Sequence, residues 1–451
     1  MRGTNLFPAG LLCFAMLLSP LAQAQVDALQ AARLDQDLTP LGAERAGNAE
    51  GTIPAWEGGL RRQADAQDLA RGYKDPFAAD QILFTITAAN AEQYRDRLSP
   101  GQLALLKRYP DSWKMQVYPT RRSASYSEQV YAAIKANALS AHLVEDGYGI
   151  AGTKNVVPFP IPGSALELVW NHLMRYRGVG VTRYSAGATP LANGSYQLSK
   201  MMDTALFNQD VSDYSKDNGN ILVYYRQSAL APARGAGQET LVHEPVNQVK
   251  TPRLAWIYNA GQRRVRRAPN FAYDDPASNG MATNDNGDMF SGAPDRYDWQ
   301  LVGKQEMYVP YNNYRFASKT NKYSDIIMPG HINSDLPRYE LHRVWHVRGV
   351  LKAGIRHVYK QRDLYLDEDS YQILVSDHRD NRDVLWRVGE AYTINFYDQP
   401  LVWTVGNSLY DLTSGRYTIS ILTNEEVPYD FNVPLTPADF TPAKLRQGGV
   451  R

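Results

Sequence analysis

The chain has a single cysteine and almost no surplus of either charge. The cysteine is Cys13, and 48 lysines and arginines stand against 47 aspartates and glutamates. Removal of the first 24 residues would take away Cys13 and Arg2, which leaves a mature chain without cysteine and with no net charge. Disulfides, cysteine-ligated zinc and thiol catalysis are then excluded. The balanced charge gives no indication of a nucleic-acid partner.

Catalytic signatures are also missing. The sequence has no nucleophile elbow, no Walker loop, no dinucleotide-binding fingerprint and no His-Glu-x-x-His motif. We therefore assign no catalytic residue, and we expect no cofactor and no metal.

The first 24 residues have the pattern of an export signal. Arg2 is followed by the apolar stretch Leu11–Leu18 and by Ala22-Gln23-Ala24, the small-x-small pattern after which signal peptidase cleaves. The apolar stretch is too short to span a bilayer, and no stop-transfer pattern follows it. We predict a periplasmic protein that begins at Gln25. Because that compartment has no ATP or nicotinamide pool, most kinase, ligase and dehydrogenase functions are excluded.

The chain divides into two regions by the period of its apolar residues. We expect residues 25–192 to form an extended initial segment and a helical lid, and residues 193–451 an antiparallel half-barrel, the two making one continuous domain. In the first region a helix start is predicted at Asp75-Pro76-Phe77. The predicted helices are Thr87–Leu98, a helix from Ser99 to before Pro110, Ser125–Leu143 and Ser164–Arg177.

After about Asn193 the apolar period changes from helical to alternating, which predicts a meander of antiparallel strands. Together with the helices, this gives an α+β fold with a large curved antiparallel sheet covered by N-terminal helices. The predicted strands are Asn220–Ser228, Arg253–Tyr258, Arg263–Ala268, Trp299–Val309, Arg338–Leu351, His357–Leu366, Gln372–Asp377, Leu385–Phe396 and Tyr410–Thr423.

A polar loop, Phe271–Pro294, interrupts the strands. Long polar loops within a domain are usually functional or mobile. Its segment Asn284–Asp288 has the oxygen-rich character of a calcium loop, but Ala282 and Ala293 stand where the EF-hand pattern needs Asp and Glu. We favour a solvated turn.

Two histidines and one set of acid–base side chains are candidates for a chemical site. His342 and His346 lie on a predicted strand, where two hydrogen-bonded histidines are favoured over a metal site. An envelope hydrolase would need a convergent acid–base set, and the only cluster available for one is Asp295, Asp298, Glu306 and His342.

Four arginines make the densest charge feature of the chain. Arg263 and Arg267 should point to one face of their strand, and Arg264 and Arg266 to the other. One pair could hold a phosphate or carboxylate head group; the alternative is cross-strand pairing with acidic residues. A second feature, Pro158–Gly163, either lines an opening or packs across the sheet, and packing is favoured.

Three stretches resemble a known family. They are Leu38–Gly59; Pro158–Gly163 with Trp170–Gly178; and Trp256–Arg267 with Asp295–Trp299 and Val309–Asn312. They are similar to an uncharacterised family of exported Gram-negative proteins, number 1329 in the series of domains of unknown function, which is described as outer-membrane lipoprotein-sorting-protein-like. The resemblance covers the mature chain. It implies a half-open curved sheet with an apolar cavity, and partnership with an outer-membrane β-barrel protein and an inner-membrane efflux-type transporter.

The resulting hypothesis is a periplasmic carrier that binds a lipid or another hydrophobic molecule between the sheet and the helices. A carrier must hide acyl chains from water, since each exposed methylene costs about 0.8 kcal/mol. The alternatives are a non-catalytic adaptor between the two membrane components and the envelope hydrolase. Residues predicted to contact the ligand are Leu222, Tyr224, Trp256, Tyr258, Trp345 and Trp386 as cavity wall, and Arg263, Arg264, Arg266 and Arg267 at the head group.

Overall fold

The computed structural model describes residues 26–60, 72–209, 211, 219–248, 250–268 and 273–448. The predicted signal peptide and its cleavage site lie outside the described residues. No described helix is long and apolar enough to cross a membrane.

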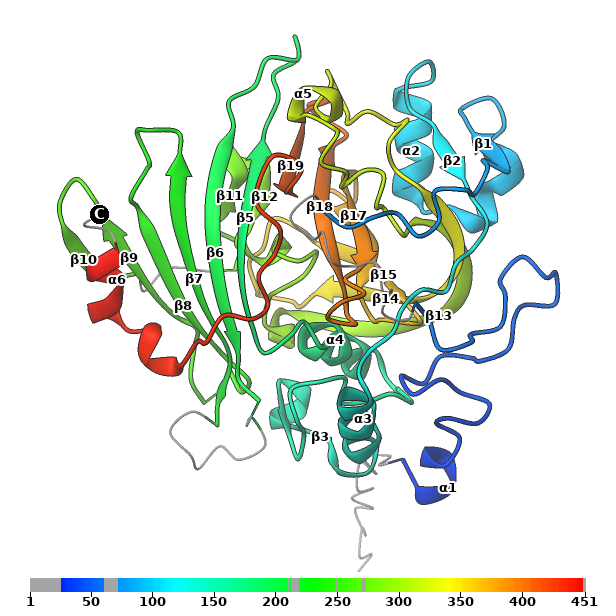
Figure 1. The fold of residues 1–451 in the computed structure, drawn as a ribbon, viewed down its shortest axis with the longest axis horizontal. Coiled ribbons are helices and arrows are strands. Elements are labelled where there is room, and N and C mark those ends of the chain that lie inside the picture. Colours follow the sequence, from blue (N-terminus) through cyan, green and yellow to red (C-terminus); the bar gives the residue numbers. More distant parts are fainter. Residues whose placement is uncertain are drawn as a thin grey trace, which may run out of the picture.

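One large open sheet dominates the fold (Figure 1). Its 15 strands run in the order β1-β2-β14-β15-β16-β17-β18-β19-β5-β6-β7-β8-β9-β10, and β13 pairs with β14. Neighbouring strands are antiparallel, except for a single parallel pairing of β14 with β2. The predicted curved antiparallel sheet of an α+β protein is therefore confirmed.

The strands of this sheet are β1 Phe84–Ile86, β2 Met115–Val117, β5 Gly180–Ala188, β6 Ser199–Phe207, β7 Ile221–Ala231, β8 Glu239–Pro245, β9 Leu254–Asn259, β10 Arg264–Arg267, β13 Tyr297–Pro310, β14 Tyr339–Leu351, β15 Gln361–Asp367, β16 Ile373–Arg379, β17 Leu385–Asn395, β18 Val402–Asp411 and β19 Tyr417–Leu422. Two small hairpins pair β3 His142–Val144 with β4 Gly149–Ala151, and β11 Pro276–Ala277 with β12 Ala282–Thr283.

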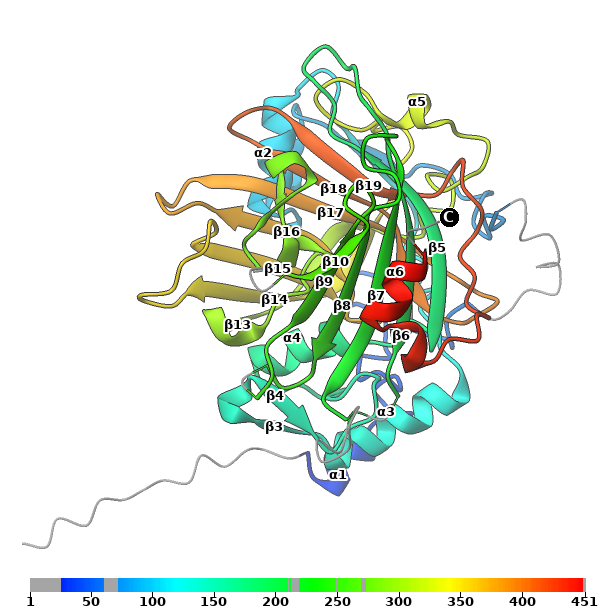
Figure 2. The same cartoon turned by 90° about the vertical axis from the view of Figure 1, so that its left-hand side faces the viewer.

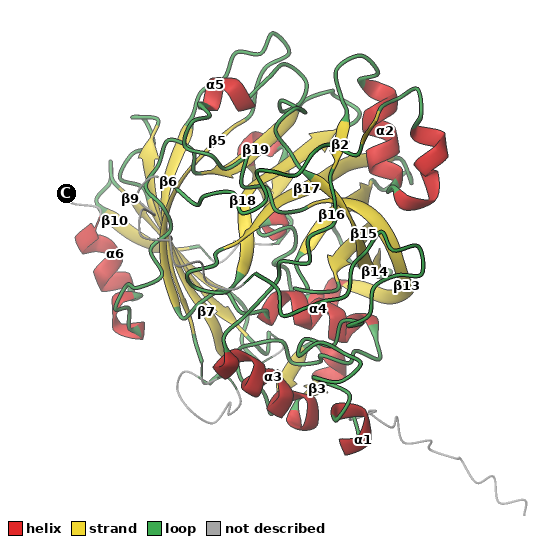
Figure 3. Cartoon of the chain, turned by 45° about the vertical axis from the view of Figure 1, so that its right-hand side comes forward, coloured by secondary structure: helices red, strands yellow, loops and turns green. Residues whose placement is uncertain are grey.

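The helices are short and lie around the sheet (Figure 3). They are α1 Ala28–Ala31, α2 Pro100–Arg108, α3 Glu128–Ser140, α4 Ala165–Met174, α5 Tyr323–Ile326 and α6 Pro442–Gly448. A 3₁₀ helix lies at η2 Ala91–Arg97, and single 3₁₀ turns lie at η3 Glu145–Gly147, η4 Ser278–Gly280, η5 Asn284–Asn286, η6 Pro294–Arg296 and η7 Pro437–Asp439.

Some predicted elements differ from the observed ones. Thr87–Leu98 contains only the 3₁₀ helix η2, and Asp75-Pro76-Phe77 leads into a turn rather than a helix. Tyr410–Thr423, predicted as one strand, is the end of β18, a turn and β19. The division at residue 192 stays a prediction, and the sheet takes strands from both sides of it.

Helix α2 is fixed on one face of β17 by a close backbone approach. Ser99 and Gln102 form a capping box, and Pro100 occupies the first turn. A Cβ atom at Gly101 would lie 2.0 Å from Oδ1 of Asp377 and 2.7 Å from Val388. Only glycine allows this contact.

The polar loop 273–294 packs on the opposite face of β17. A Cβ at Gly389 would lie 3.2 Å from Cε of Met289, and residues 388 and 389 point to opposite faces of the strand. The loop contacts both arms of the sheet, since Arg253 donates to the Ser291 carbonyl and Arg387 to the Gly280 carbonyl. The view in Figure 2 shows these arms, β5–β10 and β13–β18, running in different directions. The loop therefore joins the two arms.

The buried carboxyl group of Asp377 makes stability depend on pH. It accepts hydrogen bonds from Ser99 Oγ at 3.2 Å and from the Gly101 N–H at 2.8 Å. Burial, reinforced by the charge of Asp363 and opposed by Arg379 and these hydrogen bonds, raises the pKa of Asp377 to about 7. Because folding raises this pKa, the folded protein favours the protonated acid. The free energy of unfolding is therefore highest below pH 4, about the pKa of the unfolded chain, and it falls as the pH rises toward 7.

We predict that Asp377→Asn removes this pH dependence. An asparagine keeps the shape of the protonated acid, so its stability relative to the wild type should rise by roughly 2–4 kcal/mol between pH 4 and pH 8. Urea denaturation of both proteins at the two pH values measures the difference. Parallel pH profiles of the two proteins would contradict the prediction.

Candidate functional site

The predicted cavity-wall residues lie in several separate places. Tyr224 and Tyr258 are buried, and Trp256 is partly buried, in a cluster that Phe440 and Leu445 of the C-terminal segment cover. Leu222 belongs to a different cluster, with Trp170 and Met174. The ring of Trp345 lies 4.5 Å from the ammonium group of Lys304, and Trp386 donates its Nε1–H to Asp411. The set stays a prediction, and the structure does not bring its six members around one cavity.

The four arginines of the predicted head-group contact lie at a free end of the sheet. Arg264, Arg266 and Arg267 belong to the edge strand β10, and Arg263 directly precedes it. All four side chains are exposed, and none has a salt bridge to another described residue. Cross-strand pairing with described acidic residues therefore does not account for them, and their role as a head-group contact stays a prediction.

The acid–base cluster weighed for a hydrolase does not converge. Asp298 and Glu306 lie eight residues apart on β13, about 26 Å along a strand, and Asp295 precedes Asp298. The Nε2 atom of His342 lies 3.0 Å from Oε2 of Glu340. His346 contacts Asp363 at 2.7 Å, so the prediction of two hydrogen-bonded strand histidines is confirmed.

The acidic residues weighed for calcium are engaged by basic side chains in the interior. Asp285 contacts the Arg362 guanidinium and lies 3.1 Å from His357 Nε2. Asp288 accepts hydrogen bonds from Arg175 at 2.5 Å and Arg177 at 2.8 Å. The segment does form a turn with Gly287 exposed, but Asp285 is buried and both acidic side chains are bound by basic residues, so the prediction that the turn is solvated was wrong for these carboxylates.

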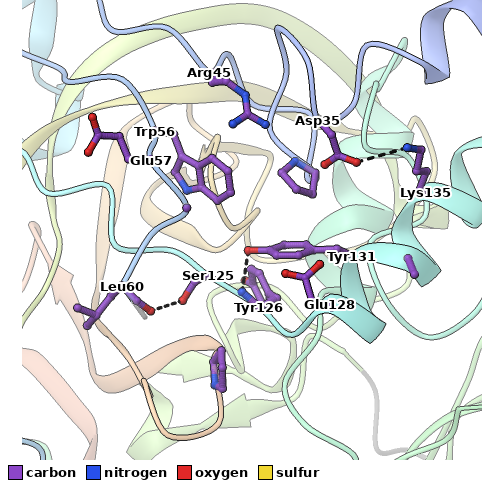
Figure 4. A pocket seen from close by; sticks show the side chains of 14 residues that line it. Asp35, Arg45, Trp56, Glu57, Leu60, Ser125, Tyr126, Glu128, Tyr131 and Lys135 are labelled. Carbon is purple, nitrogen blue, oxygen red and sulfur yellow. Dashed lines mark hydrogen bonds and ion pairs between the residues drawn. The ribbon is translucent and has the colours of Figure 1, made fainter. Parts of the chain in front are cut away.

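An open cleft lies between the initial segment and helix α3 (Figure 4). Its volume is about 770 Å³. Aromatic and aliphatic side chains form the floor, and charged side chains of both signs form the rim. The floor residues are Pro40, Trp56, Leu60, Tyr126, Tyr131 and Pro400; the rim residues are Asp35, Arg45, Glu57, Glu128 and Lys135.

The polar atoms of the aromatic floor are largely bound by the protein itself. Trp56 donates its Nε1–H to the Ala124 carbonyl at 3.2 Å, and the Tyr131 hydroxyl accepts the Tyr126 N–H at 2.8 Å. Burial raises the pKa of Tyr131 to about 12, which keeps this hydroxyl neutral. The rings therefore offer apolar faces to whatever enters the cleft.

One wall of the cleft belongs to the strap, the name we give to residues 38–59. Arg122 holds the strap by donating hydrogen bonds to the carbonyl of Glu44 at 2.8 Å and to that of Arg45 at 3.3 Å. Its guanidinium is bound on its other side by both oxygens of Asp369, at 2.8 and 2.7 Å. The cleft therefore depends on an ion pair between residues that lie 247 positions apart.

This cleft was not predicted from the sequence, although the segments that form both of its walls were identified. The strap is one of the motifs that carry the family resemblance, and α3 lies inside the predicted helix Ser125–Leu143. Trp56 in the strap and the Tyr126/Tyr131 pair were the available signals. Nothing local places them together, because Arg122 and Asp369 do so from distant parts of the chain.

The chain is thus an open, curved antiparallel-sheet protein with a cleft lined by aromatic residues. It belongs to the protein family of unknown function DUF1329, whose model matches residues 85–446. It is 53% identical over 439 residues to the uncharacterized protein PA3922 of Pseudomonas aeruginosa. The aligned residues cover 96% of each chain.

Two crystal structures are also similar. A DUF1329 family protein from Desulfovibrio piger has a TM-score of 0.42 and 13% identity, over 60% of this chain and 92% of that one. A putative outer membrane lipoprotein-sorting protein domain from Vibrio parahaemolyticus has a TM-score of 0.44 and 13% identity, over 62% of this chain and 98% of that one.

Proposed function

We propose that the protein is a periplasmic carrier that binds a small hydrophobic or amphipathic molecule in the cleft between the strap and α3. The observation that carries the proposal is the combination of an apolar aromatic floor with a charged rim. A volume of about 770 Å³ is in the range of small-molecule sites. Trp56 and Tyr131 supply large apolar contact areas for a ring or an acyl chain.

The rim provides a place for a polar head group. The Arg45 guanidinium lies 5.3 Å from the centre of the Trp56 ring, and Lys135 pairs with Asp35 at 3.3 Å. A ligand with an anionic head group would meet Arg45 directly beside the apolar floor. The proposed binding is reversible, needs no cofactor and involves no hydrolysis of the ligand.

The remaining parts of the proposal rest on the sequence. The predicted signal peptide supports a periplasmic location. The exposed arginines at β10 would contact anionic head groups outside the cleft, as when the carrier meets a membrane. Partnership with an outer-membrane barrel protein and an inner-membrane transporter is implied by the resemblance.

The proposal is tested first on the wild-type protein. We expect native mass spectrometry of protein purified from the periplasm, followed by organic extraction, to find an apolar ligand in about one copy per chain. A protein that carries no ligand and takes up neither fluorescent fatty acids nor phospholipids would contradict the carrier function.

Filling the cleft should weaken this binding. Ala132 lines the cleft on the exposed side of α3, and Ala132→Trp should weaken binding of a fluorescent fatty acid at least about tenfold by occupying the space. The matched control is Ala136→Trp, one turn further along α3, where the side chain is exposed but does not line the cleft. Equal affinity of the two variants and the wild type would place the ligand elsewhere.

A further inference from the structure

Four buried carboxyl groups lie together beneath the strap. They are Glu340, Asp367, Glu368 and Asp369, and none is more than 6% exposed. A buried carboxylate is costly unless a cation or several hydrogen-bond donors compensate its charge. We therefore examine which basic side chain compensates the negative charge of each carboxylate.

Three of the four carboxylates have a basic partner. Arg338 donates to Glu340 at 2.5 Å, and Lys304 donates to Glu368 at 2.5 Å. Asp369 holds the guanidinium of Arg122, as described above.

Asp367 has no basic side chain bonded to it. Its Oδ2 atom accepts hydrogen bonds from the Tyr311 hydroxyl at 3.0 Å and from Ser370 Oγ at 2.5 Å. Its Oδ1 atom is buried and has no hydrogen-bond partner among the described residues. The whole residue is inaccessible to bulk solvent.

His342 lies close to Asp367. The imidazole stacks on the ring of Tyr311, with the ring centres 3.8 Å apart, and its Nε2 atom lies 3.0 Å from Glu340. When Nε2–H donates to that carboxylate, the lone pair is on Nδ1, which is the arrangement that orients metal-binding histidines. His342, Asp367 and Asp369 each offer one ligand atom, and these three atoms lie within 4.8 Å of one another.

We propose that His342, Asp367 and Asp369 form a binding site for one divalent transition-metal ion such as zinc. Ligand atoms about 2.0–2.2 Å from one tetrahedral ion are about 3.3–3.6 Å apart, so side-chain atoms that lie within 4.8 Å of one another need to approach by at most about 1.5 Å. Each carboxylate oxygen has two lone pairs, so Asp369 can bind the ion while it keeps Arg122. One nitrogen and two carboxylates suit zinc or manganese better than calcium, which takes six to eight oxygens.

The ion would have a structural role. It would join β14, which carries His342, to the β15–β16 turn, which carries Asp369. Through Arg122 the same turn holds the strap over the cleft. This site is independent of the proposed carrier function, and its test requires no ligand of the cleft.

The test uses the full mature chain without a histidine tag. After treatment with a chelator and incubation with Zn²⁺, we expect native mass spectrometry to find one zinc ion per chain, and thermal denaturation to show a higher midpoint. His342→Gln should lower zinc affinity at least about 100-fold. His346→Gln, a buried histidine of the same strand, and His142→Gln, an exposed one, should keep the ion.

X-ray absorption at the zinc edge keeps the proposal testable if His342→Gln fails to fold. The wild-type spectrum should show a single imidazole and carboxylate oxygens at about 2.0–2.2 Å. A wild-type chain that binds no zinc, a site without imidazole, or a folded His342→Gln variant that retains zinc at wild-type affinity would each overturn the proposal.

Discussion

Replacing Asp285 by alanine should lower the free energy of unfolding by about 3–5 kcal/mol, because it leaves the charge of Arg362 buried without a partner. Asp285 is 1% exposed and Arg362 is fully buried, and Asp285 also lies 3.1 Å from His357. The guanidinium that loses its carboxylate is enclosed by the rings of Phe290, Tyr297 and Tyr359. Cation–π contacts with these rings compensate only part of the loss.

The measurement is urea or guanidinium denaturation of the mature chain. Asp274→Ala is the matched control, since Asp274 lies in the same loop and pairs with Arg296 at 2.9 Å at the surface. Its loss should change stability by no more than about 1 kcal/mol. Equal effects of the two substitutions would mean that the loop is not anchored through Asp285.

The position of this loop could be predicted from the sequence only in part. Phe271–Pro294 was predicted as a long polar loop; its described part, residues 273–294, contains the small β11–β12 hairpin and 3₁₀ turns. Its interior position could not be predicted, because the residues that enter the core are charged: Asp285 pairs with Arg362, and Asp288 with Arg175. A polar segment is expected to be exposed unless the residues that pair with it are known. Here Arg362 is 77 residues away from Asp285, and Arg175 is 113 residues away from Asp288.

Helices with a capping residue and strands with alternating apolar residues were predicted from the sequence. Ser99, Ser127 and Ser164 cap α2, α3 and α4, and each helix lies within or at the start of a predicted segment. Strands with alternating apolar residues were found as well. By contrast β5, β6, β8 and β18 were missed, as polar residues and glycines weaken their alternation; Gly-Val-Thr-Arg-Tyr-Ser-Ala-Gly-Ala of β5 is an example.

The candidate sites were less predictable than the fold. Tyr224, Trp256 and Tyr258 were predicted to line a cavity because they are large aromatic residues on strands, but the same property suits them to pack beneath the C-terminal segment. The cleft and the buried carboxylates are both built by contacts between the strap, Arg122 and the β15–β16 turn. Such contacts have no local pattern in a single sequence.

The strap contact leads to the second large expected effect. Arg122→Met should lower the free energy of unfolding by about 3–5 kcal/mol, because the Arg122–Asp369 pair is almost completely buried and its loss leaves Asp369 without a cation. The same change removes the hydrogen bonds to the carbonyls of Glu44 and Arg45. The matched control is Arg97→Met, which breaks a surface pair with Glu50 of the strap and should cost no more than about 1 kcal/mol.

Arg122 does not line the cleft, yet its replacement should also weaken ligand binding at least about tenfold. The strap carries Arg45 and Trp56, so its release displaces the charged rim and the aromatic floor together. Fluorescent fatty-acid titration under conditions where Arg122→Met remains folded separates this effect from unfolding. If the folded variant binds with wild-type affinity, the strap keeps its position without Arg122, and the coupling between the buried ion pair and the cleft is wrong.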